Sequence, residues 1–231
     1  MAWRRPGPDT VWLFDLDNTL HDAGTWVFGQ LNQAMGAYTA SSLQLDDAAA
    51  RALNHHYWHR YGATLLGLVR HHGVKPAHFL HQTHLLPGLE ARLDGHGHDL
   101  AALTRLRGRK FILTNAPRAY ALRVLDLLGI TRLFDGVVTI DEMRMFGQLR
   151  PKPDARMLRR LATKLGVAPE NCVLVEDTLM HQKSARRVGM ATVWMQRFTR
   201  RGQQHDAAAQ RQSMRPAYVD KRVRSLRSLA R

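Results

Sequence analysis

Two pairs of closely spaced carboxylates are the residues of this chain best suited to chemistry. Asp15 and Asp17 directly follow one short apolar segment, and Glu176 and Asp177 follow another. A spacing of two residues turns the side chains of Asp15 and Asp17 to the same side of an extended chain. Carboxylates gathered in one place repel each other and take up protons unless a cation lies among them. Magnesium prefers oxygen ligands and commonly combines one or two carboxylates with a substrate phosphate, so we expect Mg²⁺ as the cofactor.

Other polar groups of the chain suit the transfer of a phosphoryl group. A carboxylate can attack phosphorus and form an aspartyl-phosphate, and we assign this nucleophilic role to Asp15. Asp17 can protonate the leaving oxygen and later deprotonate water. Thr114 and Asn115 offer a hydroxyl and an amide to phosphate oxygens, and Lys152 offers a positive charge that also keeps Asp15 ionised. Each group alone is common in loops and turns, but together and in this order they predict a phosphatase.

The elements that must position these groups form a regular pattern along the chain. Short apolar segments with β-branched and aromatic residues predict buried strands at 10–14, 110–113, 136–140, 172–175 and 191–195. Amphipathic segments that end at or just before a glycine predict helices at 118–128, 154–165 and 183–188. Strands that alternate with helices indicate an α/β fold with a parallel, doubly wound (Rossmann-like) sheet. Ligands of such sheets bind at the carboxyl ends of the strands, where the polar groups above are predicted to meet.

The first two predicted strands are too far apart in the sequence to be joined by a single crossover helix. The segment between them has mostly helical patterns, most clearly at 46–72 and 76–86. We therefore predict a helical cap at residues 21–106, inserted after the first strand. The core domain would then consist of residues 1–20 and 107–231.

The chain is strongly basic, with a formal net charge of +15. An arginine-rich stretch lies between Arg197 and Arg231, but it is poor in lysine and aromatic residues. We favour a solvated basic surface over a nucleic-acid patch, and a positive field would also attract an anionic small-molecule substrate. Within this stretch, residues 199–214 are predicted to form a mobile loop, followed by a strand at 217–219 and a basic helix.

Composition limits the class of protein further. Hydrophobic residues make up 45% of the chain, which is enough to bury a core. Cys172 is the single cysteine, so no intramolecular disulfide can form, as is typical of a reducing cytoplasm. We find no apolar run long enough to cross a bilayer and expect no targeting segment. The expectation is a cytoplasmic enzyme without a membrane partner, and its oligomeric state stays open.

The motifs resemble those of the haloacid dehalogenase-like hydrolase superfamily. The resemblance is carried by the segments 14–20 (Phe-Asp-Leu-Asp-Asn-Thr-Leu), 113–115 (Leu-Thr-Asn), 152–153 (Lys-Pro) and 175–178 (Val-Glu-Asp-Thr). It implies Asp15 as nucleophile, Asp17 as acid/base, and Thr114 and Lys152 as phosphate ligands. Dehalogenases of this superfamily usually lack the second acid, so Asp17 implies phosphoester hydrolysis.

The resemblance also implies a set of magnesium ligands. These are the carboxylate of Asp15, the backbone carbonyl of Asp17, and Asp177 with or without Glu176. Many relatives carry a further acid about four residues beyond the fourth motif, where this chain has Met180-His181-Gln182. This departure leaves the share of Glu176 open, and His181 could either lie near the site or only begin a helix.

The predicted cap resembles that of the pyrimidine 5′-nucleotidase branch of the superfamily. The segment 57–68, together with Phe79, Leu80 and His84, carries this resemblance. It implies nucleoside monophosphates such as UMP or CMP as substrates. Aromatic residues could stack on a base, while Arg60, Arg70 or histidines face phosphate or ribose. The apolar residues of the same segment could equally form the core of the cap, since Tyr57, Leu65, Leu68 and Val69 recur at helical spacing.

Two other functions stay open at the level of the sequence. One is a sugar-phosphate phosphatase or phosphomutase of the same superfamily. The other is a nucleic-acid-binding or regulatory protein built on a phosphatase core, which the net charge of +15 and the basic tail would favour.

Overall fold

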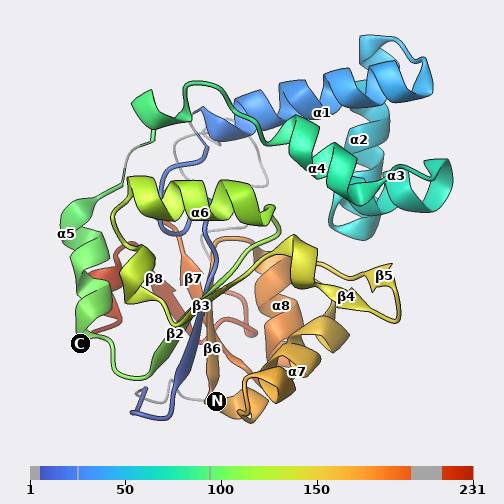
Figure 1. The fold of residues 1–231 in the computed structure, drawn as a ribbon. Coiled ribbons are helices and arrows are strands. Elements are labelled where there is room, and N and C mark those ends of the chain that lie inside the picture. Colours follow the sequence, from blue (N-terminus) through green and yellow to red (C-terminus); the bar gives the residue numbers. More distant parts are fainter. Residues whose placement is uncertain (1–5, 25, 94, 199–214, 231) are drawn as a thin grey trace.

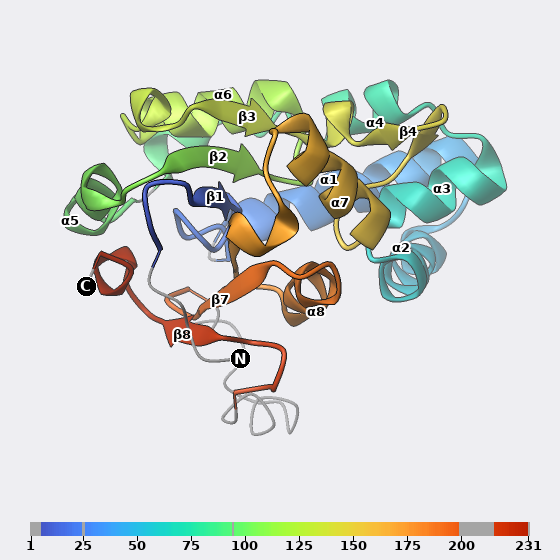
Figure 2. The ribbon, with the colours of Figure 1, turned by 90° about the horizontal axis from the view of Figure 1, so that it is seen from below.

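Six parallel strands form one sheet at the centre of the computed structural model, which describes residues 6–24, 26–93, 95–198 and 215–230 (Figure 1). Their order is β3-β2-β1-β6-β7-β8, so β1 lies inside the sheet between β2 and β6. Figure 2 shows β1, β2 and β3 side by side. The strands are β1 (Val11–Phe14), β2 (Arg109–Leu113), β3 (Gly136–Val138), β6 (Cys172–Glu176), β7 (Ala191–Met195) and β8 (Lys221–Val223). The prediction of a doubly wound, parallel α/β sheet is confirmed.

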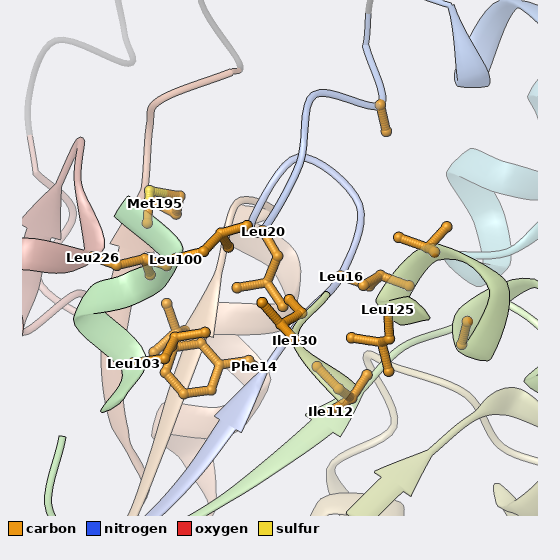
Figure 3. Packing of buried hydrophobic residues seen from close by; sticks show 14 of the residues in the cluster. Phe14, Leu16, Leu20, Leu100, Leu103, Ile112, Leu125, Ile130, Met195 and Leu226 are labelled. Carbon is orange, nitrogen blue, oxygen red and sulfur yellow. The ribbon is translucent and has the colours of Figure 1, made fainter. Parts of the chain in front are cut away.

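Helices cover both faces of the sheet because side chains of successive strand residues point to opposite sides. Trp12 and Phe14 of β1 pack in one hydrophobic cluster with residues of α6 (Arg118–Leu127), part of which Figure 3 shows. Val11 and Leu13 pack in a second cluster with residues of α7 (Ala155–Lys164) and α8 (Leu179–Arg187). With both faces buried, β1 is apolar along its whole length, as its sequence indicates.

The helix predictions hold with shifted ends. Asp154 caps α7 by accepting hydrogen bonds from the backbone N–H groups of Arg156 and Met157. α8 begins at Leu179, four residues before the predicted start at Lys183. The segment between β1 and β2 contains α1 (Val27–Leu43), α2 (Asp47–Tyr61), α3 (Thr64–His72), α4 (Pro76–Thr83) and α5 (Gly97–Leu100). The predicted helical piece 46–72 is therefore two helices, α2 and α3.

Helices α1 to α4 share a small hydrophobic cluster, to which Ile140 from beyond β3 also belongs. It contains Tyr57, Leu65, Leu68, Phe79 and Leu80, so the apolar residues at helical spacing are packing residues. The sheet cluster that contains Phe14 includes Leu89, Leu100 and Leu103 from the chain after α4, and also Val27 and Leu31 of α1. The division between core and cap at residue 106 stays a prediction.

The C-terminal prediction is wrong in its details. Residues 217–219 do not form a strand, because the N–H of Val219 donates to the carbonyl of Pro216 in a turn. Pairing with β7 begins only with Asp220, whose N–H donates to the carbonyl of Thr192, and the strand is β8. The 3₁₀ turn Leu226–Ser228 stands where a basic helix was expected, and the loop predicted at 199–214 lies outside the described residues. None of the helices in the described part of the chain has the length and apolar character needed to span a bilayer.

The thiol of Cys172 offers a simple probe of this fold. Cys172 begins β6 and is fully buried, and burial raises the pKa of its thiol to about 11. At pH 8 only about one thiol in a thousand is then ionised, and the thiolate is the reactive form. We expect the native protein not to react with Ellman's reagent and the urea-unfolded protein to react fully. Fast reaction of the native protein would contradict the packing of β6.

Candidate active site

The carboxyl ends of the central strands bring the predicted site residues together. Asp15 directly follows β1, and its N–H donates to the carbonyl of Val175 in β6. Glu176 is the last residue of β6, and Asp177 follows it. Thr114 follows β2 and is buried, with its N–H donating to the carbonyl of Val138. The parallel pairing of these strands places groups distant in sequence at one edge of the sheet.

Lys152 is the electrostatic centre of this edge. Its Nζ lies 2.7 Å from Oδ1 of Asp15 and 2.7 Å from Oε2 of Glu176, and all three side chains are buried. Burial alone would lower the pKa of Lys152, but the charges of Asp15 and Glu176 outweigh it and raise the pKa above its usual value. Lys152 is thus a permanent cation that fixes two carboxylates in place.

Asn115 positions Lys152 through its main chain. Its Nδ2 donates to the carbonyl of Lys152, and its Oδ1 accepts from the N–H of Lys152, both at 2.9 Å. Because both ends of the amide are engaged in this way, direct contact between Asn115 and phosphate stays a prediction. We propose instead that Asn115 holds the loop that presents Lys152.

Three carboxylates lie close enough to share one cation. One carboxylate oxygen from each of Asp15, Glu176 and Asp177 lies within 4.8 Å of the other two. Among the described residues, these form the group of acids, histidines or cysteines that is placed to hold a metal ion. Burial raises the pKa of Asp15 to about 8, and repulsion from Glu176 adds to the effect. The charge of Lys152 lowers this pKa but does not outweigh them, so the prediction that Lys152 keeps Asp15 ionised is wrong for the site without a cation. Burial, then the charges of Glu176 and Asp15, also raises the pKa of Asp177. This largely buried oxygen set, in which Asp15 and Asp177 favour the protonated form without a cation, fits a hard divalent ion such as Mg²⁺.

Glu176 has more partners than the other two acids. Its Oε2 contacts Lys152 and lies 3.0 Å from Nδ1 of His181, and its Oε1 accepts from the N–H of Thr178 at 3.1 Å. Burial would raise the pKa of Glu176, but Lys152 and His181 lower it below its usual value. We propose that Glu176 mainly anchors Lys152, and that Asp177 is the better metal ligand. His181 therefore lies at the site, in the first turn of α8.

Asp17 lies beside this group with partners that the sequence did not indicate. Oδ1 of Asp17 accepts a hydrogen bond from the hydroxyl of Tyr120 at 2.6 Å and lies 2.9 Å from Nε2 of His21. Burial would raise the pKa of Asp17, but the hydrogen bond with His21, helped by Tyr120, lowers it below its usual value. The only hint in the sequence is the position of His21, four residues after Asp17.

The turn between α2 and α3 touches the loop that carries Lys152. Gly62 ends α2 with a φ of 79°, and a Cβ atom at this position would lie 2.7 Å from Cδ of Pro153. A methyl group cannot fit at that distance, so the close approach requires glycine. Trp58, one turn earlier on α2, and Met180 are half-exposed. Through this turn the predicted cap contacts Pro153, the residue that follows Lys152.

Replacement of Gly62 by alanine tests this contact. We expect Gly62→Ala to lower the free energy of unfolding by about 2–3 kcal/mol, because a positive φ and a clash with Pro153 add together. Gly73→Ala is the matched control, since Gly73 ends α3 with a φ of 64° and has nothing within 4 Å of its Cβ position. Urea denaturation of both variants would separate the two effects. Equal losses of stability would show that the contact with Pro153 is unimportant.

Two histidines of the predicted cap pair with tyrosine hydroxyl groups. His72 and His71 pair with the hydroxyl groups of Tyr57 and Tyr61 at 2.7 and 2.6 Å. Tyr61 also lies beneath the guanidinium groups of Arg60 and Arg70. Of the aromatic residues proposed for base stacking, Tyr57 is buried in the cap core, whereas Trp58 and Tyr61 are accessible.

Comparisons with known proteins agree with this geometry. The model of a hydrolase family described as haloacid dehalogenase-like hydrolase matches residues 11–189. The chain is 27% identical over 203 residues to phosphate metabolism protein 8 of Saccharomyces cerevisiae, an alignment that covers 81% of this chain and 63% of that protein. It is 33% identical over 106 residues to the plasmid phosphoglycolate phosphatase of Cupriavidus necator, covering 46% and 41% of the two chains. The chain thus spans less than two thirds of the length of either relative.

Among solved structures, a phosphatase from Thermococcus onnurineus has the same fold. Its TM-score is 0.58 at 22% identity, and the match covers 95% of each chain. At this identity the likeness concerns the arrangement of helices and strands, and the chemistry must be argued from the side chains.

Proposed function

The chain belongs to the haloacid dehalogenase-like hydrolases, and from this premise we propose that it is a magnesium-dependent phosphatase that acts on phosphomonoesters through an aspartyl-phosphate. The observation that carries the proposal is the pair of acids at the end of β1 with Lys152 buried against the first of them. The phosphoglycolate phosphatase among the relatives supports the same reaction. Asp17 argues against dehalogenation, a reaction that needs no acid for the leaving group.

The proposed reaction has two steps. An oxygen of Asp15 attacks phosphorus while the bond from phosphorus to the leaving oxygen breaks. Asp17, whose pKa His21 and Tyr120 lower, first takes up a proton from solvent and then transfers it to the leaving oxygen. Asp17 then takes a proton from water, whose oxygen attacks the phosphorus and releases Asp15 and inorganic phosphate. Lys152 keeps Asp15 oriented throughout, and Thr114 offers its hydroxyl to a phosphate oxygen. Mg²⁺ held by the carboxylates of Asp15 and Asp177 and the carbonyl of Asp17 would supply positive charge beside the phosphate.

For the substrate we propose a pyrimidine nucleoside monophosphate such as UMP or CMP. The accessible rings of Trp58 and Tyr61 lie on the part of the cap next to Pro153, and the arginines at Tyr61 would complement a nucleotide's charge. The relatives support a sugar phosphate or phosphoglycolate as the second candidate. Phosphate release from UMP, CMP, fructose 1-phosphate and phosphoglycolate with Mg²⁺ would separate the two. The nucleotide proposal fails if the pyrimidine nucleotides are not the faster substrates.

Binding of magnesium should be visible without any substrate. A ligand present at about 100 times its dissociation constant stabilises a protein by about 2.7 kcal/mol. For a chain of this size we expect Mg²⁺ to raise Tm by about 5–10 °C relative to EDTA. Asp177→Asn should remove most of this increase in Tm. Asp135→Asn should keep it, because Asp135 lies just before β3 and away from the three acids. An unchanged Tm in the wild-type protein would exclude the proposed site.

A further inference from the structure

Two buried side chains from different parts of the fold converge on one oxygen of Asp17. Tyr120 lies in the first turn of α6, and its hydroxyl donates to Oδ1 at 2.6 Å. His21 lies in the loop after β1, and its Nε2 is 2.9 Å from the same Oδ1. Tyr120 is 2% exposed and His21 is completely buried, so neither contact is exposed to competition from bulk water. Such converging hydrogen bonds restrict both the position and the rotation of a carboxylate.

The surroundings of His21 indicate that the ring is there for this contact. A carboxylate oxygen only accepts hydrogen bonds, so Nε2 of His21 is the donor. Nδ1 of His21 has no hydrogen-bond partner among the described residues. A buried polar atom without a partner destabilises a fold, and an apolar side chain would fill the space at lower cost. Stability of the fold alone would favour an apolar side chain at this position. We therefore attribute the presence of His21 to its interaction with Asp17.

The ring of Tyr120 is itself held from the other side. His84 follows the end of α4, and its ring packs edge-on against Tyr120 with the centroids 5.7 Å apart. This contact restrains the tyrosine ring, so its hydroxyl stays directed at Asp17. In the described part of the structure, no hydrogen bond is found at the second oxygen of Asp17, Oδ2.

We propose that His21 and Tyr120 are positioning residues that hold Asp17 through Oδ1 and so present Oδ2 to the leaving oxygen of the substrate. The proposal rests on the proposed function, in which Asp17 gives a proton to that oxygen. Without the two contacts the carboxyl group can rotate, and the proton is no longer delivered along one direction. Positioning of this kind affects the rate of bond cleavage and leaves substrate binding intact.

The test compares two esters that differ in their need for an acid. An alkyl phosphate such as UMP needs protonation of its leaving oxygen, whereas p-nitrophenyl phosphate has a leaving group that departs as the anion. Tyr120→Phe removes only the hydroxyl, and His21→Leu removes the donor. We expect each to lower kcat/KM for UMP, or for the best alkyl phosphate found, by about 10- to 100-fold, a fraction of what a general acid contributes. For p-nitrophenyl phosphate the loss should stay below about threefold.

Two further variants separate positioning from a purely structural role. His21→Gln keeps an N–H donor near the position of Nε2 and should recover most of the activity that His21→Leu loses. In an Asp17→Asn background, Tyr120→Phe should cause no further loss, because residues that act through one group are not additive. Thermal unfolding of each variant shows whether it is folded under the assay conditions.

The outcomes distinguish this proposal from the proposed function. If the wild-type protein releases phosphate from both esters, but the variants lose activity toward both equally, the positioning role is overturned and the phosphatase stands. A further loss from Tyr120→Phe in the Asp17→Asn background would overturn it as well. If the wild-type protein releases phosphate from neither ester, the phosphatase assignment fails and the positioning role falls with it.

Discussion

Asp15→Asn should abolish magnesium-dependent phosphate release, with kcat lowered at least about 10⁴-fold, as for the loss of other enzyme nucleophiles. The amide has the size of the carboxylate but cannot attack phosphorus. The fold should survive, because Lys152 keeps its ion pair with Glu176. Burial and Glu176 also raise the pKa of Asp15 to about 8, so the site tolerates a neutral side chain without a metal. The measurement is steady-state release of phosphate, with circular dichroism as the check of folding.

Asp9→Asn is the matched control for this variant. It makes the same chemical change at an exposed position just before β1, at the opposite end of the strand from the site. Its activity should equal that of the wild-type protein. Asp17→Asn gives a second comparison, because with p-nitrophenyl phosphate it should still form the phosphoenzyme but hydrolyse it slowly. Turnover retained by Asp15→Asn would refute the assignment of the nucleophile.

Lys152→Met should have the largest effect on stability. It leaves Asp15 and Glu176 buried without the cation that lies 2.7 Å from each of them. Removal of one member of a buried ion pair typically destabilises a protein by about 3–5 kcal/mol, because the remaining charge is left uncompensated. We expect a loss of this size in urea denaturation at pH 7 with EDTA, together with a loss of activity.

Lys164→Met provides the control for the substitution itself. Lys164 is exposed at the end of α7, and its replacement should change the free energy of unfolding by no more than about 0.5 kcal/mol. The double variant Lys152→Met with Glu176→Gln also removes the stranded charge of Glu176. It should be more stable than Lys152→Met alone, since residues in direct contact are coupled. Equal stability of Lys152→Met and Lys164→Met would mean that the buried pair contributes nothing to the fold.

Much of the core and of the candidate site follows from the sequence because the relevant patterns are local. The apolar segment of β1 is continuous because both of its faces are buried, and polar residues follow where the strand ends. Parallel pairing then brings Asp15, Thr114 and Glu176 to one edge of the sheet without any further information. Helix ends such as Asp154 and Gly166 were visible for the same reason, since capping and positive φ are properties of single residues, whereas the break at Gly62 inside the predicted piece 46–72 was missed.

Only the tertiary structure decided which side chains touch across long stretches of sequence. Tyr120 reaches Asp17, and the amide of Asn115 binds the main chain of Lys152, because α6 and the loop before α7 fold over the same strand ends. No periodicity or spacing encodes such contacts, which depend on the packing of whole elements. The same holds for β8, whose start depends on a hydrogen bond between Asp220 and Thr192. The sequence by itself therefore determined the type of sheet and the identity of the acids. The fold decided how Asp17 is held, because that depends on contacts between residues as far apart as Asp17 and Tyr120.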